Sequence, residues 1–247
     1  MSLLHQDEPS WPDLPSQAQA QQLAQWLAGP RSRALRRAAI GHRRRVLEAG
    51  AGYCVVTSEL ARRCRGQVIA LDRRVDALAG CATPEVSFVA GDAQQLPLAD
   101  ASFDLVFFQN TLLWLADLQV AIAESWRVLE SGGAVVALEP DYGGMMEYPD
   151  WGIRELWISG LSQAGADPLV GRKLPALCEA VGFQVWVELS HIPQPAEAEA
   201  LALLNDLPLT ANQRQIAQNV RDYIKSANGD WAVFLHLPYF LIVATKR

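Results

Sequence analysis

Three groups of glycine and acidic residues follow predicted strands, and together they could hold a nucleotide-like ligand. The first group is Glu48, Gly50 and Gly52, which ends an apolar stretch and precedes a predicted helix. Glycines at such a point let the backbone turn tightly and let a ligand approach closely. Taken alone, a Gly-x-Gly pair after a strand is more often an ordinary turn. The pair therefore gains meaning only from the groups that follow it.

The other two groups contribute carboxylates at the ends of the next two predicted strands. Asp72 ends the apolar stretch 67–72, where a carboxylate can accept the hydrogens of both ribose hydroxyls of an adenosine ligand. Asp92, between Gly91 and Ala93, could accept from an adenine amino group while the next backbone N–H meets a ring nitrogen. Each also has a structural interpretation, Asp72 as a helix N-cap and Asp92 as a turn residue.

The elements that must position these groups alternate between apolar strands and helices. Strands are predicted at 45–49, 67–72, 86–90, 103–108 and 134–138. Helices are predicted at 53–64, 74–80 and 117–129, the last capped by Ser131-Gly-Gly133. This alternation favours a doubly wound α/β fold with a mostly parallel sheet covered on both faces. In such folds the ligand lies outside the carboxyl ends of the strands, where all three groups fall.

The rest of the chain is expected to cover this core. Residues 1–40 are predicted to be an N-terminal helical segment, followed by one domain at 41–247. Two cap-like insertions, at 141–168 and 191–230, carry aromatic, Met and helix-forming residues. Further elements are a helix at 170–181, strands at 183–189 and 239–245, two helices within 194–226, and an ambiguous apolar stretch at 232–237.

Composition limits the partners and the compartment. A net charge of −6 argues against generic binding to nucleic acid or to an anionic membrane. No apolar run is long enough to span a membrane, and the N-terminus lacks a signal-peptide pattern. The four cysteines have no zinc spacing, so no metal is expected, and free thiols in a reducing cytoplasm are the simple interpretation. The arginine-rich stretch 31–45 is interpreted as a solvated helix face, or alternatively as a patch for an anionic substrate.

With these motifs in order, residues 45–140 resemble the core of class I S-adenosylmethionine-dependent methyltransferases, a Rossmann-like family. The resemblance covers about two-fifths of the chain. It implies seven strands with the last one antiparallel, and S-adenosyl-L-methionine as the cofactor. The motifs that carry it are Val46-Leu-Glu-Ala-Gly-Ala-Gly52, Val68-Ile-Ala-Leu-Asp72, Gly91-Asp-Ala-Gln-Gln-Leu-Pro97, Ser102-Phe-Asp-Leu-Val106 and Arg127-Val-Leu-Glu-Ser-Gly-Gly133.

The resemblance also implies cofactor contacts at the first two strand ends. Glu48, Gly50 and Gly52 would line the methionine and ribose part of the cofactor. Asp72 would hold the ribose hydroxyls, with Arg73 beside the adenine. These assignments make the glycine turn and the second strand end two halves of one predicted site.

Further contacts are implied at the third and fourth strand ends. Asp92 and Ala93 would bind the adenine edge, and Gln109 and Asn110 would lie near the sulfonium and its methyl group. The family often has a third glycine where this chain has Cys54, beside Tyr53. That departure keeps a non-catalytic protein that binds the cofactor or its demethylated product as an alternative. A nicotinamide-dependent oxidoreductase fits less well, because the third glycine of its fingerprint is missing.

Methyl transfer from a sulfonium is an in-line displacement, so the protein mainly orients the reactants and keeps water out. A base is needed only if the acceptor loses a proton. Asn110, Tyr142 and His191 are the predicted catalytic or acceptor-positioning residues, with Glu139 and Asp141 as further candidates. Each alone is more often a cap or turn residue. The expected acceptor is a small, partly hydrophobic molecule, and the protein is expected to be a monomer or homodimer.

Overall fold

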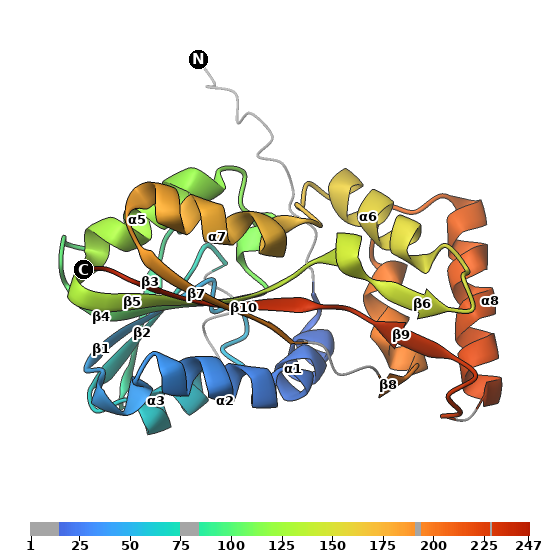
Figure 1. Ribbon diagram of the computed structural model, residues 1–247, viewed down its shortest axis with the longest axis horizontal. Helices are drawn as coiled ribbons and strands as arrows, with labels where there is room; N and C mark the ends of the chain where they lie inside the picture. The colour runs from blue at the N-terminus through green and yellow to red at the C-terminus, as the bar shows by residue number, and fades with distance from the viewer. Residues whose placement is uncertain (1–14, 75–83, 191–193, 228) are drawn as a thin grey trace, which may run out of the picture.

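A seven-stranded sheet forms the centre of the protein, in the order β3-β2-β1-β4-β5-β10-β7 (Figure 1). The computed structural model describes residues 15–74, 84–190, 194–227 and 229–247. All neighbouring strands are parallel except β10, which is antiparallel to both β5 and β7. The predicted sheet, mostly parallel with an antiparallel last strand, is therefore confirmed. The strands are β1 Arg45–Ala49, β2 Gln67–Asp72, β3 Val86–Ala90, β4 Phe103–Gln109, β5 Leu129–Pro140, β7 Gln184–Ser190 and β10 Tyr239–Thr245.

Both faces of the central strands β1, β4, β5 and β10 are largely buried, which explains why these strands are mostly apolar. Side chains alternate between the faces, so Leu47 and Ala49 belong to one hydrophobic cluster while Val46 belongs to the other. Figure 1 shows α5 and α7 along one face and α2 and α3 along the opposite face. The bounds of these helices are α2 Ala28–Arg37, α3 Thr57–Arg63, α5 Leu118–Val128 and α7 Val170–Val181.

Local signals account for several helix ends. The helix α1, Gln17–Trp26, begins with a capping box in which Ser16 and Gln19 each accept from the other's backbone N–H. The helix α7 ends at Gly182, whose φ of 113° is the left-handed conformation that glycine adopts without strain. The predicted helix at 53–64 begins only at Thr57, because the residues before it form turns. The predicted helix at 74–80 lies almost wholly outside the described residues.

The C-terminal end of α5 differs from the prediction. Ser131-Gly-Gly133 does not cap the helix but lies inside β5, which starts directly at Leu129. The last residues of the chain explain this, because Gly132 donates to the Lys246 carbonyl and Lys246 donates back to Gly133. Pairing with a distant segment therefore extends the strand beyond its apolar part.

A second, smaller group of elements lies beyond one end of the sheet, and we call it the cap (Figure 1). Its three-stranded antiparallel sheet, in the order β6-β9-β8, was not predicted. Strands of two or three residues are too short to show a period of two in the sequence. The cap consists of β6 Met146–Tyr148, α6 Ile153–Gln163, β8 Gln194–Pro195, the 3₁₀ segment η4 Ala198–Asn205, α8 Ala211–Ala227 and β9 Phe234–His236.

None of the described helices is both long enough and apolar enough to cross a membrane.

Candidate functional site

A cavity of about 230 Å³ opens at the carboxyl ends of β1, β2 and β4. Because parallel strands end at the same edge of a sheet, residues far apart in the sequence meet there. All but two of the residues predicted to contact a cofactor line this cavity. They are Gly50, Gly52, Asp72, Arg73, Ala93, Gln109 and Asn110. The two exceptions are Glu48, which is buried, and Asp92, which lies half-buried nearby.

The turn after β1 has a backbone that favours glycine. Gly50 has a φ of 76°, and a Cβ added to it would lie 2.1 Å from Cγ2 of Thr111. Gly52 has a φ of 50°, and the nearest atom to a Cβ there would be an Asp72 oxygen at 4.0 Å. The space beside Gly52 is therefore open, whereas Gly50 is needed for close approach to the turn after β4.

Cys54, the residue that replaces the family's third glycine, also has a left-handed backbone, with a φ of 54°. Glycine adopts this conformation without the steric cost that other residues meet. Cys54 is disulfide-bonded, so the expectation of free thiols is wrong at this position. Cys64 and Cys178 are free, as expected.

Asp72 connects the end of β2 to the glycine turn. Its Oδ2 accepts from the backbone N–H of Gly52 at 2.7 Å, and its Oδ1 accepts from the N–H of Arg74 at 2.9 Å. Each carboxylate oxygen has a second lone pair that these bonds leave available. Asp72 is thus held in place by the backbone and can still accept hydrogen bonds from a ligand in the cavity.

Asp92 also makes local contacts that fit its structural interpretation as a turn residue. Its Oδ1 accepts from the backbone N–H of Gln94 at 2.8 Å. Its Oδ2 lies 3.8 Å from the guanidinium of Arg73, so the two residues predicted to lie beside the adenine are an ion pair. The predicted pair is therefore brought together, with the Arg73 side chain lining the cavity.

The turn after β4 is held by a buried carboxylate. Oε1 of Glu139 accepts from the backbone N–H groups of Thr111 and Leu112, both at 2.9 Å. Burial raises the pKa of Glu139 to about 7. Asn110 stands beside this turn with a φ of 53°, and its Oδ1 accepts from the hydroxyl of Tyr239 at 3.0 Å. Glu139 therefore positions the turn, and Tyr239 orients the Asn110 amide.

A buried arginine links the N-terminal helices to the same cavity. Arg31 of α2 forms an ion pair with Glu59 at 2.7 Å and donates to the Ala24 carbonyl and to Oε1 of Gln109. Nearby, burial raises the pKa of Glu48 to about 7. No local pattern in the sequence distinguishes Arg31 from its neighbours. Two other arginines of the stretch are paired at the surface, Arg33 with Glu188 and Arg45 with Glu130.

A second cavity of about 300 Å³ lies between the sheet and the cap. Its wall is formed by residues of α1, the turn after β4, η4 and β9, and it is largely apolar and aromatic. Pro15, Leu23, Asn110 and Trp114 line both cavities, so the two meet at a shared wall. Large aromatic side chains of this second wall are Trp26, Trp114, Tyr142, Trp157 and Tyr239.

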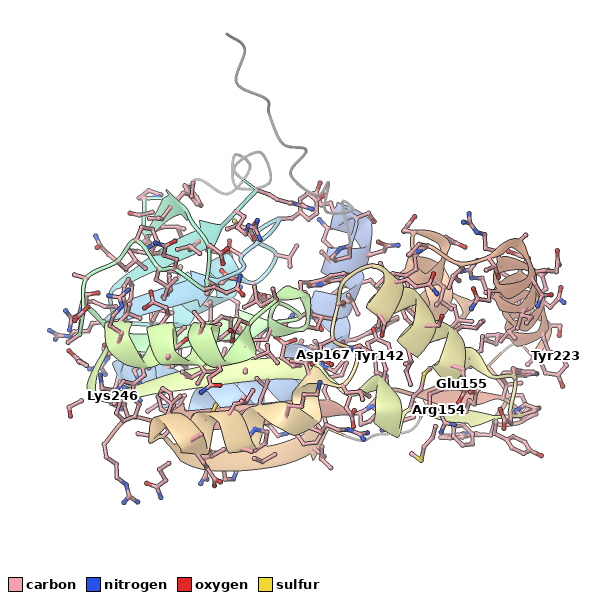
Figure 2. The ribbon with its side chains drawn as sticks, turned by 90° about the horizontal axis from the view of Figure 1, so that it is seen from above. Tyr142, Arg154, Glu155, Asp167, Tyr223 and Lys246 are labelled. Atoms are coloured by element: carbon pink, nitrogen blue, oxygen red, sulfur yellow. The ribbon has the colours of Figure 1, made fainter. Side chains whose placement is uncertain are left out.

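The predicted catalytic residues have different positions relative to this second cavity. Tyr142 lines it, with its ring centroid 5.0 Å from that of Trp157, and burial raises its pKa well above its usual range. Asp141 does not line it, and instead forms a two-contact ion pair with Arg172 at 2.8 Å. His191 lies outside the described residues. Figure 2 shows Tyr142 where the sheet and the cap adjoin.

Several residues that line the second cavity were not predicted from the sequence to belong to a site. His236, which the sequence does not single out, is 7% exposed and lines the cavity. Leu23 of α1 and Trp157 of α6 line it as well. The only available signal for His236 was a single polar residue in the ambiguous apolar stretch 232–237. Within the described ranges, no three or more His, Cys, Asp and Glu side chains are grouped as metal ligands would be.

Comparison with known proteins agrees with this geometry. Residues 47–137 match the sequence model of the family described as "Methyltransferase domain". Demethylmenaquinone methyltransferase of Mycolicibacterium paratuberculosis is 40% identical over 100 residues, which are 40% of this chain and 43% of that protein. A transposon-encoded uncharacterized protein of Streptomyces fradiae is 34% identical over 104 residues, 41% of this chain and 30% of that protein. The matches thus span less than half the length of these relatives.

Solved structures share the fold over most of the chain. A putative methyltransferase from Bacillus halodurans superposes with a TM-score of 0.65 and 16% identity, over 87% of this chain and 98% of that one. The Haemonchus contortus phosphoethanolamine N-methyltransferase 2, solved with S-adenosylhomocysteine, gives a TM-score of 0.57 and 17% identity, over 83% of this chain and 49% of that one. At these identities the likeness concerns the fold alone.

Proposed function

We propose that this chain is a class I S-adenosylmethionine-dependent methyltransferase and that it transfers a methyl group to a small, partly hydrophobic molecule. The observation that carries this proposal is the pair of cavities with a shared wall. The first would hold the cofactor and the second the acceptor, and Asn110 and Trp114 border both. Methyl transfer requires this arrangement, because the reacting atoms must be held in line and in contact.

The residues of the first cavity fit S-adenosylmethionine, the donor that the family implies. The oxygens of Asp72 can accept from ribose hydroxyls while they keep their bonds to Gly52 and Arg74. The open space beside Gly52 admits a ligand against the backbone. In the proposal, Glu48 and Gly50 support the methionine and ribose side of the site. When bound, the cofactor supplies an electrophilic methyl group on a sulfonium.

The remaining cofactor contacts are proposed at the other strand ends. Arg73, Asp92 and Ala93 would surround the adenine, since Arg73 and Ala93 line the cavity and Asp92 is paired with Arg73. Gln109 and Asn110 would lie near the sulfonium, which their position at the end of β4 supports. The hydrogen bond from Arg31 to Gln109 would fix that side chain before the cofactor arrives.

The second cavity supports an acceptor that is small and largely apolar. Its volume of about 300 Å³ is at the lower end of the range for small-molecule sites. Its aromatic wall would exclude water from the reacting atoms, and Tyr142 and Asn110 supply polar groups for orientation. The likeness to a demethylmenaquinone methyltransferase over 40% of this chain is compatible with a hydrophobic acceptor.

The wider setting of the proposed enzyme follows from the composition of the chain. We propose that it acts in the cytoplasm as a monomer or homodimer. We also propose that it acts without nucleic acid, which the net charge of −6 supports. We also propose that residues 41–247 form one domain, with 1–40 as a helical segment and insertions at 141–168 and 191–230.

The proposal is tested by measuring cofactor binding and methyl transfer separately. Calorimetry should show one site for S-adenosylmethionine and for S-adenosylhomocysteine, and labelled methyl should reach a product from a panel of small hydrophobic acceptors. Leu203→Trp, which fills the second cavity, should abolish transfer and leave cofactor binding unchanged. Failure to bind either compound would contradict the proposal. Binding without transfer to any acceptor would instead favour a non-catalytic cofactor-binding protein.

A further inference from the structure

His236 occupies a buried position in the wall of the second cavity. It is the last residue of β9, the central strand of the cap sheet, where it pairs with Met146 of β6. The residue is 7% exposed and its side chain lines the cavity. Pairing with β6 holds the backbone at His236, and β8 pairs with the two residues before it, so the imidazole is presented to the cavity from a strand of the cap sheet.

The other ionisable groups of this wall are less suited to take a proton at neutral pH. Burial raises the pKa values of Tyr142 and Tyr239 well above their usual range. Glu197 and Glu199 are exposed and stand at the rim. Among the described lining residues there is no other imidazole and no lysine, arginine or cysteine. Histidine is the side chain whose ordinary pKa lies nearest neutrality, which suits it to accept a proton.

The shape and polarity of the wall favour a planar aromatic acceptor with a hydroxyl group. The rings of Tyr142 and Trp157 lie 5.0 Å apart and inclined by 32°, and Trp114 and Tyr239 add further apolar faces. A cationic amine would need a carboxylate in the buried wall, whereas the described carboxylates of this cavity are exposed at its rim. A neutral phenol carries no such requirement.

The polar groups of the wall place the reacting atom near the cofactor cavity. Asn110 borders both cavities. The hydroxyl of Tyr239 donates a hydrogen bond of 3.0 Å to the side-chain oxygen of Asn110, and Tyr239 lies three residues beyond His236. The same bond leaves the amide hydrogens of Asn110 to donate elsewhere. A hydroxyl oxygen at this shared wall would be in reach of a methyl donor in the first cavity.

We propose that His236 is a catalytic residue that accepts the proton of an aromatic hydroxyl, so that the protein methylates oxygen. The inference rests on the proposed function. In the step, the acceptor O–H bond breaks and its proton passes to the imidazole, while an oxygen lone pair forms the O–CH₃ bond. The S–CH₃ bond of the sulfonium breaks, its electron pair stays on sulfur as S-adenosylhomocysteine, and the imidazolium later returns the proton to water.

The first test follows the ionisation of a bound phenol, and it requires no turnover. 4-Nitrophenol is titrated into the wild-type protein, with and without S-adenosylhomocysteine, and the phenolate absorbance is recorded against pH. The bound probe should ionise at a lower pH in the wild type than in His236→Gln. His42→Gln, which removes an exposed histidine, should behave as the wild type. Absence of binding to the wild type, or equal ionisation in wild type and His236→Gln, would overturn the inference.

The second test measures methyl transfer to a series of phenols of increasing hydroxyl pKa. Loss of a general base should lower the rate by about 10²- to 10⁴-fold for the least acidic phenols and much less for nitrophenols, which ionise unaided. S-adenosylhomocysteine affinity and thermal unfolding should be unchanged in His236→Gln, which separates this inference from the cofactor site. A uniform loss across the series, or transfer only to carbon or nitrogen, would overturn it. If the wild-type protein does not bind S-adenosylhomocysteine, the proposed function itself is overturned.

Discussion

The sheet and the cap build their cavities in opposite ways. At the sheet, the cavity is formed by turns that each follow a strand, so strand order alone brings Gly50, Asp72 and Asn110 together. At the cap, the cavity is formed by segments from α1, η4 and β9, which are far apart in sequence and meet only through tertiary packing. The family match at residues 47–137 falls within the sheet and does not reach the cap. Under the proposed function, a cofactor site of the matched family and an acceptor site particular to this chain would be combined in one chain.

The two regions are joined by backbone hydrogen bonds and by one continuous hydrophobic cluster. Figure 2 shows Tyr142 and Asp167 at this boundary, with Tyr223 at the far end of the cap and Lys246 at the opposite end of the sheet. Asp167 donates its backbone N–H to the Leu113 carbonyl, and Tyr142 donates to that of Pro168. If the regions are energetically separable, changes in the cap should alter stability and acceptor binding but not the cofactor site.

The largest effect is expected from a cap residue, Trp157. Trp157→Ala removes a side chain that is 4% exposed, and such truncations cost about 3–5 kcal/mol of unfolding free energy. Urea denaturation measures the loss, and calorimetry should show unchanged S-adenosylhomocysteine affinity below the transition. Trp231→Ala, which truncates a tryptophan that is 60% exposed, should cost about 0.5 kcal/mol or less. A matching loss of cofactor affinity in Trp157→Ala would show that the regions are not separable.

The second largest effect is expected at the glycine turn. Gly50→Ala combines a left-handed backbone with a Cβ that would overlap Thr111, and should cost about 3 kcal/mol of stability as well as most cofactor binding. Gly132→Ala is the matched control, because its φ of 81° is similar but no atom lies within 4 Å of the added Cβ. Comparing the thermal unfolding of the two variants separates the cost of the left-handed backbone from the cost of the overlap with Thr111. Equal destabilisation would mean that the contact with Thr111 is unimportant.

A third prediction concerns Asp72, and it tests the cofactor site alone. Asp72→Ala removes the proposed ribose acceptor and should cost about 2–3 kcal/mol of S-adenosylmethionine affinity, or about 30- to 150-fold in Kd. Calorimetry on this variant is compared with Asp222→Ala, which removes an exposed carboxylate of α8 in the cap. Unchanged affinity in Asp72→Ala would remove the assignment.

The smallest effect is expected in the pH dependence of stability. Because burial raises the pKa of Glu139 to about 7, the folded state holds this proton more tightly than the unfolded state, whose pKa is near 4.5. Its contribution is full below the unfolded pKa and is lost as the pH rises toward 7, by roughly 2 kcal/mol between pH 5 and 7. Glu139→Gln should reduce the slope of the stability curve in that window and leave the part that Glu48, whose pKa is raised in the same way, contributes.

Denaturation at several pH values checks this, with Glu124→Gln as control. Hydrogen bonding to Arg127 lowers the pKa of Glu124, so its contribution is lost only as the pH falls below the unfolded value. Its replacement should leave the slope between pH 5 and 7 unchanged. An unchanged slope in Glu139→Gln would mean that Glu139 is ionised in the folded protein.

The sequence predicted the sheet far better than the cap, for physical reasons. Each strand of the sheet is at least five residues long and mostly apolar, and Asp72 and Gly50 are positioned by their place at the end of a strand. The helix at 170–181 and the strand at 239–245 were predicted at their observed limits. His236 and Leu23 could not be predicted as neighbours, because no local pattern specifies which segments pack against each other. Arg31 illustrates the same limit, since only the folded chain shows which arginine of the stretch is buried.

The position of α1 couples the two proposed ligands. Because Leu23 forms part of both walls, a displacement of this helix would reshape both cavities at once. The affinities of donor and acceptor would then be linked by the same factor in each direction. We accordingly expect that saturating S-adenosylhomocysteine changes the Kd of an acceptor analogue, and that the analogue changes the Kd of S-adenosylhomocysteine equally.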